Sequence, residues 1–404
     1  MLKSDLTPLI TATGICSAIG CGNEAFRYAL HNGATNFRIM QRPGRQYDNQ
    51  FIGAEITEPF PASPSTVRNP SLTINAALTS LHEAWQHARL DRSDPERIGI
   101  IIGGSNLQQR EHQLVRELYQ HKASWLTPRY AMNFMDTDIS ACLSEEFGIR
   151  GFAYSVGGAS ASGNLALILA AQAIQRQQVD IAICVGALSD LSWWELQALS
   201  NVGAMGSARF AANPSGACRP FDALSDGFIF GEACGVLVIE AAHHAMRRQQ
   251  AALAAITGWA FSSEANRGPE ASVDGEARVM MAALGQAGWT AQDIDYVNPH
   301  GSGSPSGDRT ELAALQRCQL NHARINATKS LTGHTLSAAG SVEAIATLIQ
   351  MQHGFLHGCQ NLDAPLNPDF NWVKTTEFQS IQRALNLSYG FGGMNTALCL
   401  EYIG

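Results

Sequence analysis

The sequence lacks the features that would place it in several large functional classes. It has no block of basic residues, and its 27 Lys and Arg are outnumbered by 35 Asp and Glu, for a formal net charge of -8. Binding to nucleic-acid phosphates needs clustered Lys and Arg, so we expect no nucleic-acid partner. No apolar run reaches the roughly 18–20 residues of a membrane-spanning helix, so we expect no membrane segment.

Several catalytic and metal-binding signatures are also missing. The stretch GASAS at 158–162 fails the Gly-x-Ser-x-Gly pattern of serine hydrolases at its last position. His82 and His87 are five residues apart, whereas a four-residue spacing puts two zinc ligands on one helix face. No phosphate-binding loop or dinucleotide fingerprint occurs. We therefore expect no metal site and no cofactor bound by the chain itself.

The cysteines form no C-x-x-C pair. There are nine of them, an odd number, and they lie in apolar contexts such as IAICVGA and GEACGVLVIE. This pattern is typical of free, buried thiols in a reducing compartment. It predicts a cytoplasmic protein.

What the sequence does contain is the alternation of an α/β fold. The 404 residues are 45% hydrophobic, enough to bury a large core. Short apolar runs predict buried strands, and helix-length segments lie between them, which favours parallel pairing in a largely buried sheet. The predicted strands are 8–15, 98–104, 180–187, 235–242 and 396–403, and the predicted helices are 73–90, 163–178, 276–289 and 340–354.

The stretch VGGASASGNLALIL, 156–169, leads from a glycine pair through two serines into one of these helices. The helix is apolar on all sides, so we expect it to be buried on all sides. Its N-terminus would direct free N–H groups at residues 158–162. Serine is also a common helix cap, so this segment alone does not make Ser160 a nucleophile.

Two histidines lie in loops of small residues further along the chain. His300 lies in VNPHGSGSPSGDRTEL, and His334 follows Lys329 in NATKSLTGHTLSAAGSVEAI. Small neighbours leave room for a substrate, and a helix N-terminus stabilises developing negative charge. Together the two loops indicate a catalytic site.

Taken together, these segments resemble the β-ketoacyl synthases, condensing enzymes with the thiolase fold. The match is closest to elongating synthases that use acyl carrier protein (ACP), and it runs over essentially the whole chain. Five blocks occur in the family's order: ITATGICSAIGCGNEAFRYALHNG, RPFDALSDGFIFGEACGVLVIE, NPHGSGSPSGDRTE, KSLTGHTLSAAG and YGFGGMNTAL.

The resemblance implies a five-layered αβαβα fold built from two similar halves within one integrated domain. Residues 1–250 would form the N-terminal half with the nucleophile turn, and 251–404 the C-terminal half with the two histidine loops. Such enzymes are usually dimers, so the expected partners are ACP and a second copy or another ketosynthase. The only cofactor implied is the phosphopantetheine arm of the carrier protein.

The resemblance also assigns catalytic roles. Ser160 stands where the family has its nucleophilic cysteine, and Ser162 aligns with a structural serine. His300 and His334 would donate hydrogen bonds to the thioester oxygen. Lys329 would fix the geometry of this loop.

Four further residues would support the site. Glu343 is the expected carboxylate partner of the loop lysine. Phe391 would gate the acyl pocket, and its backbone N–H would complete a second oxyanion hole with that of Ser160. Ser302 and Ser304 replace threonines that contact the pantetheine arm.

The serine at position 160 leaves three functions open. A cysteine at a helix N-terminus is already a good nucleophile, whereas a serine needs a general base within reach. Decarboxylation of malonyl-ACP needs only donors at the thioester oxygen and a dry pocket, so this is the favoured reaction. The alternatives are condensation or acyl transfer through acyl-Ser160, and a non-catalytic partner like the chain-length subunits of active synthases.

Overall fold

A central β-sheet organises the chain. The computed structural model describes residues 4–61 and 65–404. In these residues the main sheet has 11 strands, ten of them in one continuous order and β2 (Gly20–Cys21) paired to the side of β1. The continuous order is β12 (Arg324–Ile325), β11 (Tyr296–Asn298), β15 (Arg383–Gly390), β16 (Met394–Tyr402), β10 (Ala254–Ser263), β1 (Pro8–Ser17), β9 (Ala233–Ala241), β7 (Ile181–Gly186), β5 (Ile98–Gly103), β6 (Ala153–Val156).

The ten strands fall into two sets with the same topology. The first set is β1, β5, β6, β7 and β9, and the second set is β10, β11, β12, β15 and β16. When the strands of each set are numbered 1 to 5 along the chain, both sets have the same spatial order, 3-2-4-5-1. In each set the first two pairs in this order are parallel, and the remaining pairs are antiparallel. β1 and β10 join the sets through only two residue pairs. The fold is therefore built from two similar halves; the boundary after residue 250 stays a prediction.

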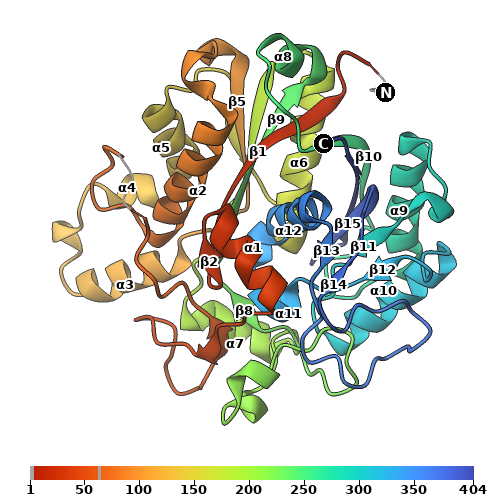
Figure 1. Cartoon of the computed structure of the whole chain (residues 1–404). Coiled ribbons are helices and arrows are strands. Elements are labelled where there is room, and N and C mark those ends of the chain that lie inside the picture. Colours follow the sequence, from red (N-terminus) through yellow and green to blue (C-terminus); the bar gives the residue numbers. More distant parts are fainter. Residues whose placement is uncertain (1–3, 62–64) are drawn as a thin grey trace.

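Helices form the other three layers. α6 (Ser162–Gln175) and α12 (Ala339–His353) lie in the middle, between the two sets of strands, with one outer pair of helices on each side (Figure 1). The outer helices are α2 (Leu72–Ala88) and α5 (Thr137–Phe147) on the first set, and α9 (Val273–Ala287) and α10 (Pro305–Arg317) on the second. This is the expected five-layered αβαβα arrangement.

Close packing of α6 on α12 positions the site. A Cβ atom on Gly163 would lie 2.8 Å from the backbone nitrogen of Ser341, and one on Gly340 would lie 2.5 Å from that of Asn164. Only glycine permits such an approach, so the N-terminal ends of the two buried helices touch. The short 3-10 turns that precede them, Ala159–Ala161 and Leu336–Ala338, are therefore brought into contact.

The expectation of parallel pairing is wrong for the centre of the sheet. β9, β1, β10 and β16 pair antiparallel with their neighbours, and only the outer three strands of each set are parallel. The connection from β7 to β9 is not a crossover that returns to the same edge of the sheet. The connection, residues 187–232, contains α7 (Trp193–Asn201) and β8 (Phe230–Gly231), and β9 then runs antiparallel to β7.

The expectation that all the cysteines are free is also wrong for two of them. The β1–β2 hairpin places Cys16 opposite Cys21, with their Cα atoms 4.0 Å apart, and the two form a disulfide. The other seven cysteines form no disulfide in the described residues, and six of them are buried. The cytoplasmic location stays a prediction. In residues 4–61 and 65–404, none of the helices combines the length and apolar character that crossing a membrane requires.

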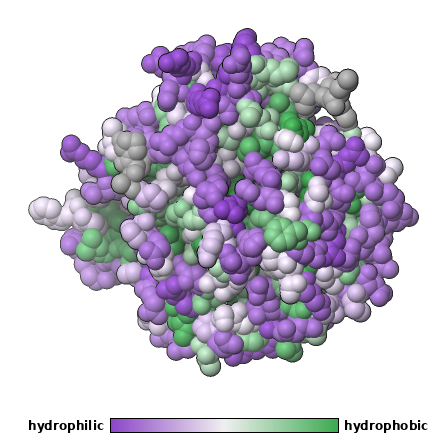
Figure 2. All heavy atoms as spheres, in the orientation of Figure 1, coloured by the Kyte–Doolittle hydropathy of each residue, from purple (hydrophilic) through white to green (hydrophobic). Residues whose placement is uncertain are grey.

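One face of the molecule carries an apolar surface patch. Figure 2 shows hydrophobic residues gathered over α3 (Gln109–Tyr119) and α4 (Tyr130–Asn133), at the left of the view. The large side chains exposed in this region are Leu118, Trp125, Met132, Phe134 and Met135. We refer to these five residues as the α3–α4 patch.

Candidate active site

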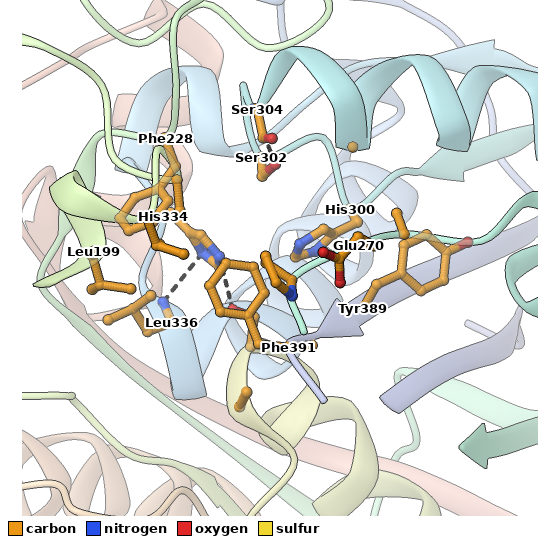
Figure 3. Close-up of a pocket in the computed structure, with 18 of the residues that line it drawn as sticks. Leu199, Phe228, Glu270, His300, Ser302, Ser304, His334, Leu336, Tyr389 and Phe391 are labelled. Atoms are coloured by element: carbon orange, nitrogen blue, oxygen red, sulfur yellow. Dashed lines mark hydrogen bonds between the residues drawn. The ribbon is translucent and has the colours of Figure 1, made fainter. Parts of the chain in front are cut away.

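A cavity of about 700 Å³ opens where the two halves meet. Its walls come from both halves of the chain, and Figure 3 shows polar and aromatic side chains converging on it. Six of the sequence-predicted site residues line it: Ser160, His300, Ser302, Ser304, His334 and Phe391.

The turn at Ser160 is held by its own backbone and by Ser162. Ala159 adopts φ 48°, a left-handed conformation that is uncommon outside glycine. The Ser162 hydroxyl accepts the backbone N–H of Gly158 at 2.9 Å and donates to the carbonyl of Ala159 at 2.7 Å. Ser162 thus braces the turn, while the side chain of Ser160 faces the cavity.

The segment that carries Phe391 approaches this turn closely. A Cβ atom on Gly390 would lie 2.2 Å from the carbonyl oxygen of Gly158, so a larger residue could not sit there. The Phe391 side chain is 45% exposed and lies at the cavity beside His334 (Figure 3). This position suits a movable ring at a pocket entrance; its gating role and the oxyanion role of its N–H stay predictions.

His334 is fixed with one nitrogen toward Ser160. Its Nε2 lies 2.9 Å from the Ser160 hydroxyl oxygen, and its Nδ1 accepts the backbone N–H of Leu336 at 3.2 Å. Burial, and secondarily the Lys329 charge, hold the pKa of His334 well below its usual range. The neutral ring therefore carries its proton on Nε2, because Nδ1 must keep a free lone pair.

His300 is oriented in a similar way. The Lys329 ammonium group lies 3.5 Å from its Nδ1 and donates to its carbonyl oxygen at 2.5 Å. The Glu311 carboxylate accepts the His300 backbone N–H at 2.6 Å. Burial first, and then Lys329 and His334, hold the pKa of His300 well below its usual range. A cation beside Nδ1 leaves the proton of the neutral ring on Nε2.

The two imidazoles face each other across the cavity. Their ring centroids are 5.3 Å apart and their planes are inclined by 79° (Figure 3). Both rings have an Nε2–H group to offer. This pair of donors can bind one oxygen atom and stabilise negative charge that develops on it.

Lys329 pairs with Glu343 beneath the histidines, as predicted. Lys329 begins α11 (Lys329–Thr332), Glu343 lies in α12, and the Nζ–Oε1 distance is 2.5 Å with both side chains buried. Burial raises the pKa of Glu343 to about 7, opposed by the Lys329 charge. Glu343 thus holds the Lys329 ammonium group in place, and the charge of this group favours the neutral forms of both rings.

Ser302 and Ser304 lie on the other wall of the cavity, before α10. The Ser302 hydroxyl accepts the backbone N–H of Ser304 at 3.2 Å, and both side chains appear above the histidines in Figure 3. Each keeps a hydroxyl toward the cavity that could bind a polar chain. Contact with a pantetheine arm stays a prediction.

The cavity also holds residues that the sequence did not single out. Glu276 and Tyr389 both line it, both are buried, and each has a side-chain oxygen with no hydrogen-bond partner within the described residues. A sequence signal exists for Glu276. It lies four residues before Met280 and seven before Ala283, on the apolar face of the predicted helix, where a carboxyl is unexpected.

No metal cluster accompanies these residues. Within residues 4–61 and 65–404, no three His, Cys, Asp or Glu side chains gather in a way that could hold an ion. What the arrangement offers is a pair of N–H donors, a hydroxyl and a buried carboxyl around a cavity of substrate size. These groups suit proton transfer and stabilisation of an enolate oxygen.

The fold and this paired-histidine site are those of the thiolase-fold class of enzymes. The models of the beta-ketoacyl synthase N-terminal and C-terminal domains match residues 42–245 and 253–363. The chain belongs to the beta-ketoacyl synthase family.

Individual relatives agree with this membership. The chain is 49% identical, over all of its length and 98% of the relative's, to the polyketide biosynthesis malonyl-ACP decarboxylase PksF of Bacillus subtilis (strain 168). Among solved structures it is similar to the ishigamide ketosynthase/chain length factor, with a TM-score of 0.87, 26% identity and coverage of 98% and 99%. It shares the fold of AntDE:AntF, a type II acyl carrier protein in complex with its ketosynthase, with a TM-score of 0.87, 23% identity and the same coverage.

Proposed function

We propose that this chain is a malonyl-ACP decarboxylase of polyketide-type biosynthesis. It cleaves the bond between C2 and the carboxylate of malonyl-ACP, releases CO2 and leaves acetyl-ACP. The relative at 49% identity carries the name of this activity. The observation that carries the proposal is the hydrogen bonding of His334.

The orientation of His334 opposes an acyl-serine mechanism. Because its Nδ1 accepts a backbone N–H, its Nε2 offers a proton to Ser160. A serine needs a base that removes its proton before it can attack a thioester. His334 in this tautomer hydrogen-bonds the hydroxyl but does not activate it.

The same orientation favours decarboxylation. A thioester oxygen that binds between the two Nε2–H groups accepts electron density as the C–C bond breaks, and CO2 leaves. The two fixed donors stabilise the resulting enolate oxygen. Lys329 holds the His300 ring through Nδ1 and the backbone carbonyl, so the donors do not reorganise during the step.

Substrate delivery follows from the shape of the site. The malonyl group would arrive on the phosphopantetheine arm of ACP, which supplies no catalytic chemistry. Ser302 and Ser304 would hydrogen-bond this arm, and Phe391 would close over the malonyl end. In AntDE:AntF, a carrier protein is bound to a ketosynthase.

A dimer is part of the proposal. β6 is an edge strand of the main sheet, and its Ala153 and Tyr154 are exposed. The α3–α4 patch adds apolar surface on the same half of the chain. An open edge beside exposed apolar side chains is a surface that proteins usually cover. We propose that a second copy, or another ketosynthase, covers it.

Intact-mass analysis of the purified protein separates the functions. With malonyl-ACP, we expect conversion to acetyl-ACP without any mass change of the enzyme. With an acyl-ACP alone, we expect no adduct. An acyl adduct on Ser160 would establish the acyl-transfer alternative. Neither reaction, together with a stable complex with an active synthase, would establish the non-catalytic alternative.

A further inference from the structure

Glu276 is a buried carboxyl with no structural partner. It lies in the first turn of α9, is 1% exposed, and its Oε2 has no hydrogen-bond partner within the described residues. Most buried polar groups are hydrogen-bonded, and leaving one unpaired costs about 1–3 kcal/mol. Glu276 lines the same cavity as His300 and His334. An unpaired carboxyl at this wall is therefore available to a ligand.

The surroundings of Glu276 favour the protonated form of its carboxyl. Burial raises the pKa of Glu276 well above its usual value, and the neighbouring carboxyls of Glu311, Glu264 and Asp308 raise it further. A neutral carboxylic acid also does not repel a malonyl carboxylate in the same cavity. Glu276 thus keeps its proton to a higher pH than a solvated carboxyl does.

The tyrosine beside it has the same character. Tyr389 is buried, its hydroxyl has no hydrogen-bond partner within the described residues, and its ring centroid lies 5.6 Å from that of His300. Burial, and then the charges of Glu276 and Glu311, raise the pKa of Tyr389 well above its usual value. Two unpaired oxygen groups therefore line the wall next to the histidine pair.

The proposed reaction needs a proton donor, either a side chain or water. In a condensing enzyme, the enolate carbon attacks an acyl group. A decarboxylase that forms no acyl-enzyme must instead give this carbon a proton. The two histidines cannot supply it without loss of the hydrogen bonds that stabilise the oxygen. A separate proton donor is needed at C2.

We propose that Glu276 is the acid that protonates C2 of the enolate. The proposal rests on the decarboxylase function. The C1–C2 π electrons of the enolate take the Glu276 proton to form the new C2–H bond. The C1–O bond becomes a carbonyl again, and Glu276 is left as a carboxylate. Water entering the cavity returns the proton after acetyl-ACP leaves.

The substitution Glu276→Gln tests this role. Glutamine has nearly the same shape and is neutral, like the protonated acid, so the fold is preserved. Glu145→Gln is the matched control, because Glu145 also lies on a helix but is exposed and lies outside the cavity. With malonyl-ACP at pH 7, we expect Glu276→Gln to slow acetyl-ACP formation about 100-fold, the range of general acid catalysis, with KM unchanged. The control should stay within about twofold of the wild type, because its carboxyl is solvated.

Isotope exchange gives a second measurement that a purely structural role would not change. An enolate that waits for its proton can be recarboxylated. In the Glu276→Gln variant, we therefore expect labelled CO2 from added bicarbonate to enter the unreacted malonyl-ACP, whereas the wild type shows little exchange.

The pH profile gives a third readout. The wild-type rate should fall as pH rises through the ionisation of Glu276, and the variant should lose this fall. The other ionisable groups that face this wall are present in both proteins: Glu264, His300, Asp308, Glu311 and Tyr389. Because Glu276 interacts with the neighbouring carboxyls, the difference reports the ionisation of Glu276 together with its effect on them.

One result would contradict the decarboxylase function, and a different result would contradict the role of Glu276. If the wild type does not convert malonyl-ACP, the proposed function fails. If the wild type is active and Glu276→Gln matches it in rate, exchange and pH profile, the function stands and Glu276 is not the acid.

Discussion

The Nδ1 atom of His334 accepts the backbone N–H of Leu336, and this hydrogen bond decides which partner of the Ser160–His334 pair is the donor. In serine hydrolases, the neutral imidazole carries its own proton on Nδ1, so Nε2 is free to take the proton of the serine hydroxyl. Here Nδ1 accepts a hydrogen bond instead. The Ser160–His334 distance is therefore that of a catalytic dyad, but the imidazole proton lies on Nε2, the nitrogen that would have to accept the serine proton.

Substitutions at Ser160 should separate the two half-reactions. Ser160→Ala removes one neutral hydrogen bond, so we expect the rate of malonyl-ACP decarboxylation to change by less than about tenfold. Ser160→Cys introduces a thiol at a helix N-terminus, which lowers its pKa, so this variant should form an acyl-enzyme with acyl-ACP. Intact mass detects the adduct. Loss of decarboxylation in Ser160→Ala would show that the hydroxyl takes part in the reaction.

The histidine pair should carry most of the rate. His300→Ala and His334→Phe each remove one donor to the enolate oxygen, so we expect CO2 release to fall about 10²–10³-fold in each. Release of labelled CO2 from malonyl-ACP measures this. His87→Ala is the control, because His87 is exposed and lies outside the cavity. A full rate in either cavity variant would contradict the paired-donor mechanism.

The buried Lys329–Glu343 pair should matter for stability as well as for geometry. Lys329→Met leaves the Glu343 carboxyl buried without its partner, which we expect to cost about 3–5 kcal/mol in the free energy of unfolding. Glu343→Met added to this variant should recover much of the loss. Thermal or denaturant unfolding measures both. If the double variant is as unstable as the single one, the ion pair is not the cause.

The serines before α10 should affect binding rather than chemistry. Ser302→Ala and Ser304→Ala each remove one hydroxyl that would contact the pantetheine arm, so we expect KM for malonyl-ACP to rise about fivefold for each, the value of one hydrogen bond. The rate constant kcat should stay near that of the wild type. A fall in kcat with unchanged KM would place these residues at the reacting group instead.

The sequence was sufficient for the parts of the site that motifs encode. Ser160, His300, Lys329, His334 and Glu343 were all predicted from the family resemblance, and the structure brings the cavity residues and the ion pair together. The repeated αβαβα layers were expected for the same reason. Short motifs suffice here because the glycines and histidines within them have fixed local geometry.

Features that depend on long-range contacts were not predictable. The strand directions at the centre of the sheet depend on how the 187–232 connection runs, which no local pattern specifies. The tautomer of His334 depends on a backbone N–H two residues away in a 3-10 turn. Glu276 was missed because it matches no motif; only its place on an apolar helix face marks it as unusual.

The ionisation of Glu276 should also appear in the stability of the protein. Its folded pKa is raised above the unfolded value of 4.5, so the folded state binds more protons than the unfolded state at intermediate pH. The wild type therefore loses stability as pH rises from about 4.5 through the folded pKa. Across this window the loss is about 1.4 kcal/mol for each pH unit.

Glu276→Gln removes this loss. We expect the Tm of the variant to be close to that of the wild type at pH 5 and to exceed it at pH 8. Glu311 and Asp308 remain in both proteins, and because Glu311 interacts with Glu276, the comparison reports on the ionisation of this pair. Thermal unfolding at the two pH values measures the difference. Equal pH dependence in the two proteins would mean that Glu276 ionises in the folded state as it does in water, and a carboxyl that ionises normally could not hold a proton for C2 at neutral pH.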